Sequence, residues 1–305
     1  MVIPLNRVRR PGAMVTVSLV YVLAVSGIMI WRGISVSPDY LLAIFIPIAV
    51  LSGRLIRFLR DWVPFIVIFL AWEAMRGLAT KADIDPHVGD LANIETTLFF
   101  GHLPTAWLQS LLSGTALHLA AVIGTVVYFC HFMVPLLAGL VIWLRDRTQF
   151  LRFTATLMGM SLVAFIFFLL LPCAPPWYAQ QQGYLHGFTK LIDGTIPSEV
   201  SGLYRSMNPN PVAAFPSLHS AFPFLCFLAL RRPYPRASWV MLGWSALVWV
   251  SVVFLGEHYV IDVIAGIALA GLSWMVMMRL VVPRVALLRD RDPAPFVVHP
   301  ERAVA

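Results

Sequence analysis

The sequence predicts an all-α membrane protein, a polytopic helical bundle of about eight spans, and three observations lead to this prediction. Hydrophobic residues make up 59% of the 305 residues and charged residues only 12%, whereas a soluble domain carries about 25% charge. The mean hydropathy is +0.81. The apolar residues gather in long runs separated by short polar segments, which is typical of chains that cross a membrane several times.

The first apolar run covers residues 14–30 and follows a basic start that contains Arg7, Arg9 and Arg10. A cleaved signal peptide begins in the same way, but this run is long for one and a second span follows almost at once. We therefore expect a retained first helix. The other expected spans are 40–51, 62–78, 118–144, 150–171, 218–230, 238–255 and 259–282. The second of the eight is short enough to be tilted or partly interfacial.

Two long polar segments, 79–117 and 172–216, interrupt the spans. Apolar clusters in the first of them predict short amphipathic helices at the membrane surface. The chain then divides into N-terminal membrane helices (1–60), a membrane domain that carries every motif discussed below (61–282) and a charged, proline-containing tail (283–305) that we expect to be disordered.

The positions of the basic residues predict the orientation. With eight spans and a cytoplasmic N-terminus, most of the 22 Lys and Arg residues fall in cytoplasmic segments, as the positive-inside rule requires. The exceptions are Arg32, Arg76, Lys81, Lys190 and Arg205. Both termini are then cytoplasmic, and the segments 79–117 and 172–216 lie on the outer side. The short cytoplasmic loops and the lack of an organelle signal favour a bacterial inner membrane.

Other classes of protein fit the composition less well. The net charge of +7 and the pI near 9.7 are also found in nucleic-acid-binding proteins, but the basic residues stand in short clusters beside apolar runs, so we expect no nucleic-acid partner. Of the three cysteines, Cys130 and Cys226 lie in expected spans, which leaves Cys173 without an obvious partner and argues against a disulfide framework.

Two histidines at helix starts are the residues with chemical potential. His219 begins the span at 218–230, and His258 begins the last span, four residues before Asp262. On a helix this spacing places two side chains on one face, with their Cβ atoms roughly 5–6 Å apart. Asp262 can then hold one imidazole nitrogen of His258 and leave the other free to attack or to take a proton. The alternative is that His258 caps a membrane helix and Asp262 contacts a neighbouring helix.

The segment before His219 adds an anion-binding feature. Ser217 and Leu218 form a turn into a helix start, where backbone N–H groups and the helix dipole favour a phosphate and the serine hydroxyl adds a donor. Two histidines, a carboxylate and such a helix start suit phosphoryl transfer through a phosphohistidine, with no metal or other cofactor required. The partners would be a lipid phosphate in the bilayer and either a hydroxyl acceptor or water.

These motifs resemble a known family. Pro216-Ser217-Leu218-His219 and His258-Tyr259-Val260-Ile261-Asp262 resemble the second and third signatures of the type-2 phosphatidic acid phosphatase superfamily. The stretches 214–220 and 174–178 resemble its inositol phosphorylceramide synthase branch, as do shorter matches that include Glu95 with Leu98-Phe99 and Tyr128 with His131-Phe132. The resemblance implies a six-helix core behind N-terminal helices. It also implies that His258 is the nucleophile, Asp262 orients it, His219 protonates the leaving oxygen, and no metal takes part.

The sequence departs from the general superfamily pattern at three places. Leu218 stands where a glycine usually precedes the histidine, Val252 stands where an arginine usually binds phosphate, and the first signature has no clear counterpart. The synthase branch shares these departures. Candidates for the missing cation are Arg205 and Lys190, which alternatively face lipid headgroups as ordinary loop residues.

Three further residues are candidates for substrate contact. Trp177 and Tyr178 are either interfacial aromatics or part of the entrance for the acceptor. His131 lies inside an expected span, where it either hydrogen-bonds a neighbouring helix or contacts the polar part of the substrate.

The function expected from these observations is a membrane lipid phosphotransferase that moves a phosphoryl headgroup, such as inositol phosphate, to a hydroxyl acceptor at the outer face. The absence of arginine clamps favours a phosphodiester donor, which carries less charge than a terminal phosphate. The alternatives are a lipid phosphate phosphatase that uses water and a non-catalytic lipid-binding or transport protein. The latter has no evident need for His219, His258 and Asp262 together.

Overall fold

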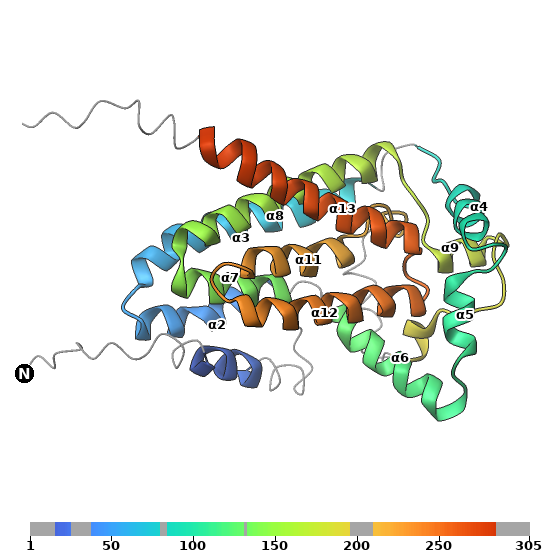
Figure 1. Cartoon of the computed structure of the whole chain (residues 1–305), viewed down its shortest axis with the longest axis horizontal. Helices are drawn as coiled ribbons and strands as arrows, with labels where there is room; N and C mark the ends of the chain where they lie inside the picture. Colours follow the sequence, from blue (N-terminus) through green and yellow to red (C-terminus); the bar gives the residue numbers. More distant parts are fainter. Residues whose placement is uncertain (1–15, 26–37, 80–83, 131–132, 196–209, 285–305) are drawn as a thin grey trace, which may run out of the picture.

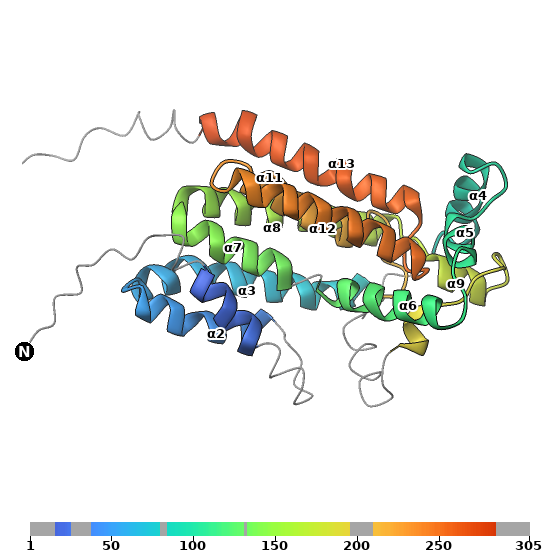
Figure 2. The same cartoon turned by 60° about the horizontal axis from the view of Figure 1, so that its bottom comes forward.

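The computed structural model describes residues 16–25, 38–79, 84–130, 133–195 and 210–284. Within these ranges the chain is helical and forms no β-strand, only two isolated bridges between loops. Figure 1 shows the long helices side by side along the longest axis of the molecule, with short helices gathered at one end, and Figure 2 shows the same arrangement from another side.

The order of the helices follows the expected runs. A short apolar helix, Thr16–Val25, precedes the labelled elements. The longer helices are α2 (Pro38–Leu51), α3 (Leu55–Ala79), α6 (Gly114–Phe129), α7 (Met133–Arg145), α8 (Arg147–Leu170), α11 (Leu218–Leu230), α12 (Pro235–Phe254) and α13 (Val260–Val276), which continues as a π-helix over Met277–Val281. The short helices are α4 (Gly89–Leu98), α5 (Pro104–Ser110), α9 (Pro176–Gln181) and the 3-10 turn η1 (Leu191–Gly194).

Local sequence signals explain several helix starts. Proline lacks an N–H group and is well tolerated in the first turn of a helix, and it begins α5, α9 and α12. The Asp146 carboxylate caps α8 by accepting from the Gln149 N–H at 2.9 Å.

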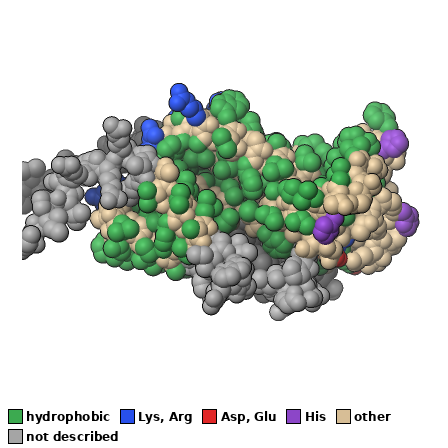
Figure 3. Space-filling model, turned by 90° about the horizontal axis from the view of Figure 1, so that it is seen from below, with side chains coloured by type: hydrophobic (Ala, Val, Ile, Leu, Met, Phe, Trp, Pro, Cys, Tyr) green, Lys and Arg blue, Asp and Glu red, His purple; other side chains and the backbone are tan. Residues whose placement is uncertain are grey.

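Three helices in the described part of the chain are long and apolar enough to cross a membrane, namely Arg147–Leu170, Pro235–Phe254 and Val260–Arg284. A fourth is added if α6 and α7 together count as one bent span. In Figure 3, hydrophobic side chains cover the length of this face, with Lys and Arg near one end and His near the other. Such a surface suits a bundle that lies in a bilayer.

The expected continuous span at 118–144 differs from the structure. It consists of two helices, α6 and α7, with an angle of 51° between them. Pro135 lies in the first turn of α7, where its missing N–H is harmless, whereas within one uninterrupted helix it would remove a hydrogen bond.

Three loops meet at the end of the bundle that carries the short helices. The Cys173 N–H donates to the Val212 carbonyl at 2.8 Å, and the Ala214 N–H donates to the Cys173 carbonyl at 3.1 Å. On the other side of Cys173, the His87 N–H donates to the Pro172 carbonyl at 2.8 Å. These bonds tie the loop before α4, the loop before α9 and the loop before α11 into one layer.

A buried carboxylate stabilises the opposite end of the bundle. Asp61 on α3 accepts from both Nε and Nη2 of Arg147, at 2.7 and 2.6 Å, and from Nε1 of Trp143 at 3.0 Å. It joins α3, α7 and α8 where the core around Trp62 is densest in aromatic rings.

Candidate active site

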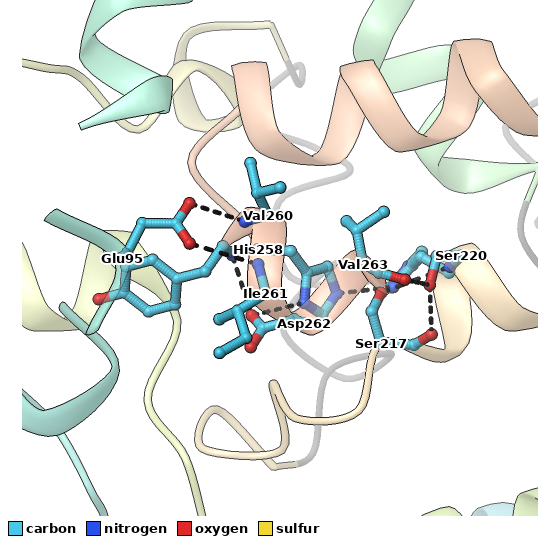
Figure 4. Close-up of polar contacts among 10 residues, drawn as sticks. Glu95, Ser217, Ser220, His258, Val260, Ile261, Asp262 and Val263 are labelled. Carbon is cyan, nitrogen blue, oxygen red and sulfur yellow. Dashed lines mark hydrogen bonds and ion pairs between the residues drawn. The ribbon is translucent and has the colours of Figure 1, made fainter. Parts of the chain in front are cut away.

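The two expected histidines lie together. Nδ1 of His219 is 3.2 Å from Nε2 of His258, and Nδ1 of His258 is 3.4 Å from Oδ2 of Asp262. Figure 4 shows the contact between His258 and Asp262 at the start of α13, beside Ser217 and Ser220 at the start of α11. The side chains of His258 and Asp262 are almost fully buried, and His219 is half-buried. The i, i+4 spacing has therefore placed the carboxylate against the imidazole, as expected.

A glycine turn presents His258 at this position. α12 ends at Phe254, and Gly256 then adopts a φ of +81°, in the left-handed region that glycine enters without strain. The N–H groups of Glu257 and His258 both donate to the carbonyl of Val252, at 3.0 and 3.1 Å. This compact turn fixes the backbone of the histidine before α13 begins.

A close crossing of α11 and α13 fixes the distance between the histidines. The Ser217 N–H donates to the Asp262 carbonyl at 3.1 Å, and Oγ of Ser220 donates to the Val263 carbonyl at 3.0 Å. A Cβ on Gly266 would collide with the Ser217 carbonyl and with Oγ of Ser220. Only glycine allows this approach, so the two helix starts are held in one geometry.

Ser217 and Leu218 are structural at this crossing. Both side chains are buried, and the Ser217 hydroxyl caps α11 by accepting from the Ser220 N–H at 3.4 Å. The sequence placed both residues correctly at a helix start. Their expected contact with phosphate remains a prediction.

Glu95 is a residue of the site that the reasoning about chemistry missed. It lies on α4 with its side chain only 1% exposed, and its two oxygens accept from the N–H groups of Val260 and Ile261, at 2.8 and 3.3 Å. Burial raises the pKa of Glu95, while these two hydrogen bonds oppose the shift. Figure 4 shows the carboxylate clamped onto the first turn of α13. In the sequence, Glu95 stands out only as an acidic residue among uncharged neighbours. It was singled out only in the stretch that resembles the synthase branch.

An aromatic ring supports the other histidine. The ring of Tyr128, near the end of α6, stacks on His219 with a centroid distance of 4.3 Å and an interplanar angle of 21°. Tyr128 also packs against the apolar cluster of Val127, Val248, Val252, Val253 and Val263. This contact brings α6 to the site from 91 positions away, which no local pattern reveals.

Lys190, Trp177 and Tyr178 form a second group beside the turn. Nζ of Lys190 lies 4.1 Å from the centroid of the Trp177 ring and 3.3 Å from Oδ1 of Asp193. The backbone N–H of Trp177 donates to the carbonyl of Gly256 at 3.1 Å. Gly256 lies two residues before His258. Tyr178 is half-buried with its ring 5.7 Å from that of Trp177. The structure therefore places Lys190, through Trp177, beside the glycine turn that precedes His258.

Two candidate residues, Arg205 and His131, lie outside the described residues. In the part of the chain that the structure describes, no group of three or more His, Cys, Asp or Glu side chains is arranged to hold a metal ion. The three cysteines, all described, are free.

This arrangement has the elements of nucleophilic phosphoryl transfer. The carboxylate at Nδ1 of His258 leaves Nε2 directed at His219, so one ring can attack phosphorus while the other exchanges a proton with the oxygen that leaves or enters. His258 and Asp262 are almost fully buried, and this low exposure strengthens the electrostatic interaction between them.

Comparisons with known proteins find one family match and similar synthases. The model of the PAP2 superfamily matches residues 89–276, from the start of α4 to the end of α13. A phosphoinositol dihydroceramide synthase of Bacteroides thetaiotaomicron is 28% identical over 236 residues, which cover 70% of this chain and 74% of that protein.

Two fungal proteins are also similar. The catalytic subunit of inositol phosphorylceramide synthase from Schizosaccharomyces pombe is 26% identical over 63% of this chain and 48% of its own length. The inositol phosphorylceramide synthase of Candida albicans is 29% identical over 46% of this chain and 32% of its own length. This chain thus spans half or less of the fungal proteins, and no solved structure matches it significantly.

The family match covers well over half of the chain. It includes Glu95, His219, the turn at Gly256, His258 and Asp262. The resemblance read from the two histidine motifs is therefore confirmed, and the chain belongs to the PAP2 superfamily.

Proposed function

We propose that this protein is a membrane lipid phosphotransferase that moves inositol phosphate from phosphatidylinositol to the hydroxyl group of a ceramide-like lipid through phospho-His258. The observation that carries the proposal is the row of contacts from His219 to His258 to Asp262 across the α11–α13 crossing. The similar proteins are named as synthases of inositol phosphorylceramides, which supports the choice of headgroup and acceptor.

The first half-reaction breaks the bond between phosphorus and the lipid alcohol. Nδ1–H of His258 donates a hydrogen bond to Asp262, which leaves the lone pair on Nε2 free to attack phosphorus. His219 gives its proton to the departing lipid oxygen, and diacylglycerol leaves. Inositol phosphate then remains on the enzyme, joined to Nε2 of His258 through a phosphorus–nitrogen bond.

The second half-reaction reverses these proton movements. The acceptor hydroxyl gives its proton to His219, its oxygen attacks phosphorus, and the bond from phosphorus to Nε2 breaks. The 3.2 Å contact between the two rings supports this exchange, because a phosphoryl group bound to one ring stays within reach of the other. Lys190, already held by Asp193 and Trp177, is our candidate for neutralising the phosphate, together with Arg205.

We also propose that the chain crosses the membrane eight times, with both termini in the cytoplasm and the histidines facing the extracytoplasmic side of a bacterial inner membrane. The distribution of arginines in the sequence and the separation of Lys and Arg from His in Figure 3 support this orientation. A cysteine at exposed Tyr184 should react with a membrane-impermeant maleimide in intact cells, and one at exposed Arg232 should not. The opposite pattern would refute the orientation.

The test of the reaction compares purified wild-type protein with His258→Ala. Phosphatidylinositol labelled in the inositol ring is supplied with and without dihydroceramide, and acid-labile label on the protein is measured after a rapid quench. We expect label on the wild-type protein that moves to dihydroceramide, and neither event in His258→Ala. His118→Ala, which changes an exposed histidine on α6, is the matched control and should behave as wild type.

Other outcomes would identify the alternatives. Release of inorganic phosphate from phosphatidic acid, without any product on dihydroceramide, would favour a phosphatase. Activity that survives in His258→Ala would refute the proposed nucleophile, and binding of phosphatidylinositol without turnover would favour a lipid-binding protein.

A further inference from the structure

An apolar groove lies on the other side of the helix that carries Asp262. Its volume is about 520 Å³, within the range of sites that hold small molecules. One wall comes from the connection after α4 and from α5, and the other comes from α12 and the first turn of α13. The residues used below are Trp107, Leu108, Val250, Val253, Val260 and Val263. The groove is open to the surface, because Trp107 and Val250 are 59% and 54% exposed.

The groove shares its floor with the support of His219. Val253 and Val263 belong to the same packed cluster as Tyr128, whose ring stacks on His219. Trp249, another residue of the groove, donates from Nε1 to the carbonyl of Ser220 at 3.3 Å, one residue after the histidine. The groove therefore adjoins the start of α11, where His219 lies.

The wall that contains α5 has a fixed position relative to His258. α4 is joined to the first turn of α13 by the two hydrogen bonds of Glu95, and α5 follows after five residues. Gln109 of α5 donates to the carbonyls of Phe254 and Thr189, both at 2.8 Å. A chain lying between α5 and α12 thus has a fixed position relative to both histidines.

The proposed reaction requires one site for a lipid alcohol beside His219. The leaving diacylglycerol and the entering acceptor both exchange a proton with this histidine, and both occupy the side of phosphorus opposite His258. Each is a hydroxyl group attached to long hydrocarbon chains. An apolar groove whose lining packs against Tyr128 and Ser220, the neighbours of His219, has the right place and chemistry for such a chain.

We propose that this groove holds a hydrocarbon chain of the lipid alcohol, first of the leaving diacylglycerol and then of the acceptor. This proposal rests on the proposed function. The groove contributes orientation rather than overall attraction, since a lipid chain gains little by moving from bilayer hydrocarbon to protein hydrocarbon. Its effect is to place the hydroxyl oxygen beside His219, which is a requirement for reaction rate.

The test fills the groove without disturbing the core. Val250→Trp adds bulk at an exposed position of α12, and Val240→Trp, on the same helix at a position 75% exposed and outside the groove, is the matched control. Transfer is measured with a dihydroceramide bearing a sixteen-carbon acyl chain and a sphingoid base of eighteen carbons, and with an analogue in which both chains are cut to about six carbons.

We expect Val250→Trp to lower kcat/KM for the long acceptor by about tenfold, the size of effect that small changes of shape have in hydrophobic pockets. The short acceptor, whose chains need not pass Val250, should lose less than about twofold, and Val240→Trp should change neither value. An equal loss for both acceptors, or no loss for either, would overturn the proposal while leaving the proposed function standing. A wild-type protein without any transfer would instead refute the proposed function and this inference with it.

A second measurement does not depend on a variant that folds less well. A diacylglycerol with a photoreactive diazirine in one acyl chain is irradiated with wild-type protein and with His258→Ala, and the labelled peptides are identified. We expect labels on α5 and α12 near Trp107 and Val250 in both proteins, removed by excess dihydroceramide. Labels spread evenly over the lipid-facing helices, or unaffected by dihydroceramide, would overturn the proposal.

Discussion

Glu95→Gln tests whether the carboxylate on α4 positions the catalytic helix. The change keeps the size of the side chain but replaces one acceptor oxygen with an NH2 group that faces a backbone N–H. One of the two amides of Val260 and Ile261 then loses its partner at a site where Glu95 is 1% exposed. A hydrogen bond to a charged group contributes about 1.5–3 kcal/mol, and the lost attraction to the helix dipole adds about 0.3–1 kcal/mol.

Part of this loss is offset in the variant. Burial raises the pKa of Glu95, and the nearby negative charge of Asp262 raises it further, so the neutral amide escapes a desolvation cost and a repulsion. We therefore expect the interaction between α4 and the first turn of α13 to lose about 2 kcal/mol of stabilising free energy. If this loss appears fully in the positioning of His258, kcat falls by up to about thirtyfold, whereas KM for phosphatidylinositol changes little.

The assay measures kcat, KM and Tm of Glu95→Gln beside Asp61→Asn. Asp61 is also a buried carboxylate that accepts hydrogen bonds from other helices, but it lies at the opposite end of the bundle. Asp61→Asn should lower Tm at least as much and leave kcat within about twofold. A Glu95→Gln enzyme with wild-type kcat, or an equal kcat loss in Asp61→Asn, would refute a positioning role for Glu95.

Three further predictions concern the same site. Gly266→Ala should cost about 1–3 kcal/mol in unfolding free energy and abolish most transfer, because its Cβ would force apart α11 and α13; Gly243→Ala on α12, with open space at its Cβ, should leave both unchanged or gain up to about 1 kcal/mol. Tyr128→Phe keeps the stacked ring on His219 and should retain several-fold more kcat than Tyr128→Leu, since such ring pairs contribute about 0.5–1.5 kcal/mol; equal rates would exclude a role for stacking. Burial raises the pKa of the Cys173 thiol to about 12, so iodoacetamide at pH 8 should alkylate it only after unfolding, and rapid labelling of the native protein would contradict the buried position.

Features set by short spacings could be predicted from the sequence. The apolar run at 218–230 became α11 with the same bounds, as the periodicity of a helix predicts. The expected contact between His258 and Asp262 also forms, but His258 lies two residues before α13 and reaches Asp262 from the preceding turn rather than along one helix face. The prediction of an all-helical membrane protein depended on composition, which the bundle reflects directly.

Features that depend on packing between distant segments could not be predicted. Glu95 reaches α13 across 165 positions and Tyr128 reaches His219 across 91, so neither contact leaves a periodic signal. The break between α6 and α7 was missed for a related reason. Hydropathy records how apolar a segment is but not its direction, and Pro135 indicates a possible break without requiring one.

The contacts of α13 also change how the site must bind phosphate. A helix start normally offers free N–H groups to an anion. Here the amide of Tyr259 donates to Asp262 at 2.9 Å, and those of Val260 and Ile261 donate to Glu95. These three amides are therefore occupied by carboxylates and cannot also bind the substrate.

In the proposed reaction, the charge of the transferred group must then be met by side chains from the loops around the site. Two buried carboxylates at the start of α13 repel a doubly charged phosphate more than a singly charged phosphodiester. Lys190 is placed beside the turn through Trp177 and Gly256, which suits neutralisation of a single charge. This electrostatic argument, made from contacts rather than from missing motif arginines, independently favours a phosphodiester donor over a terminal phosphate.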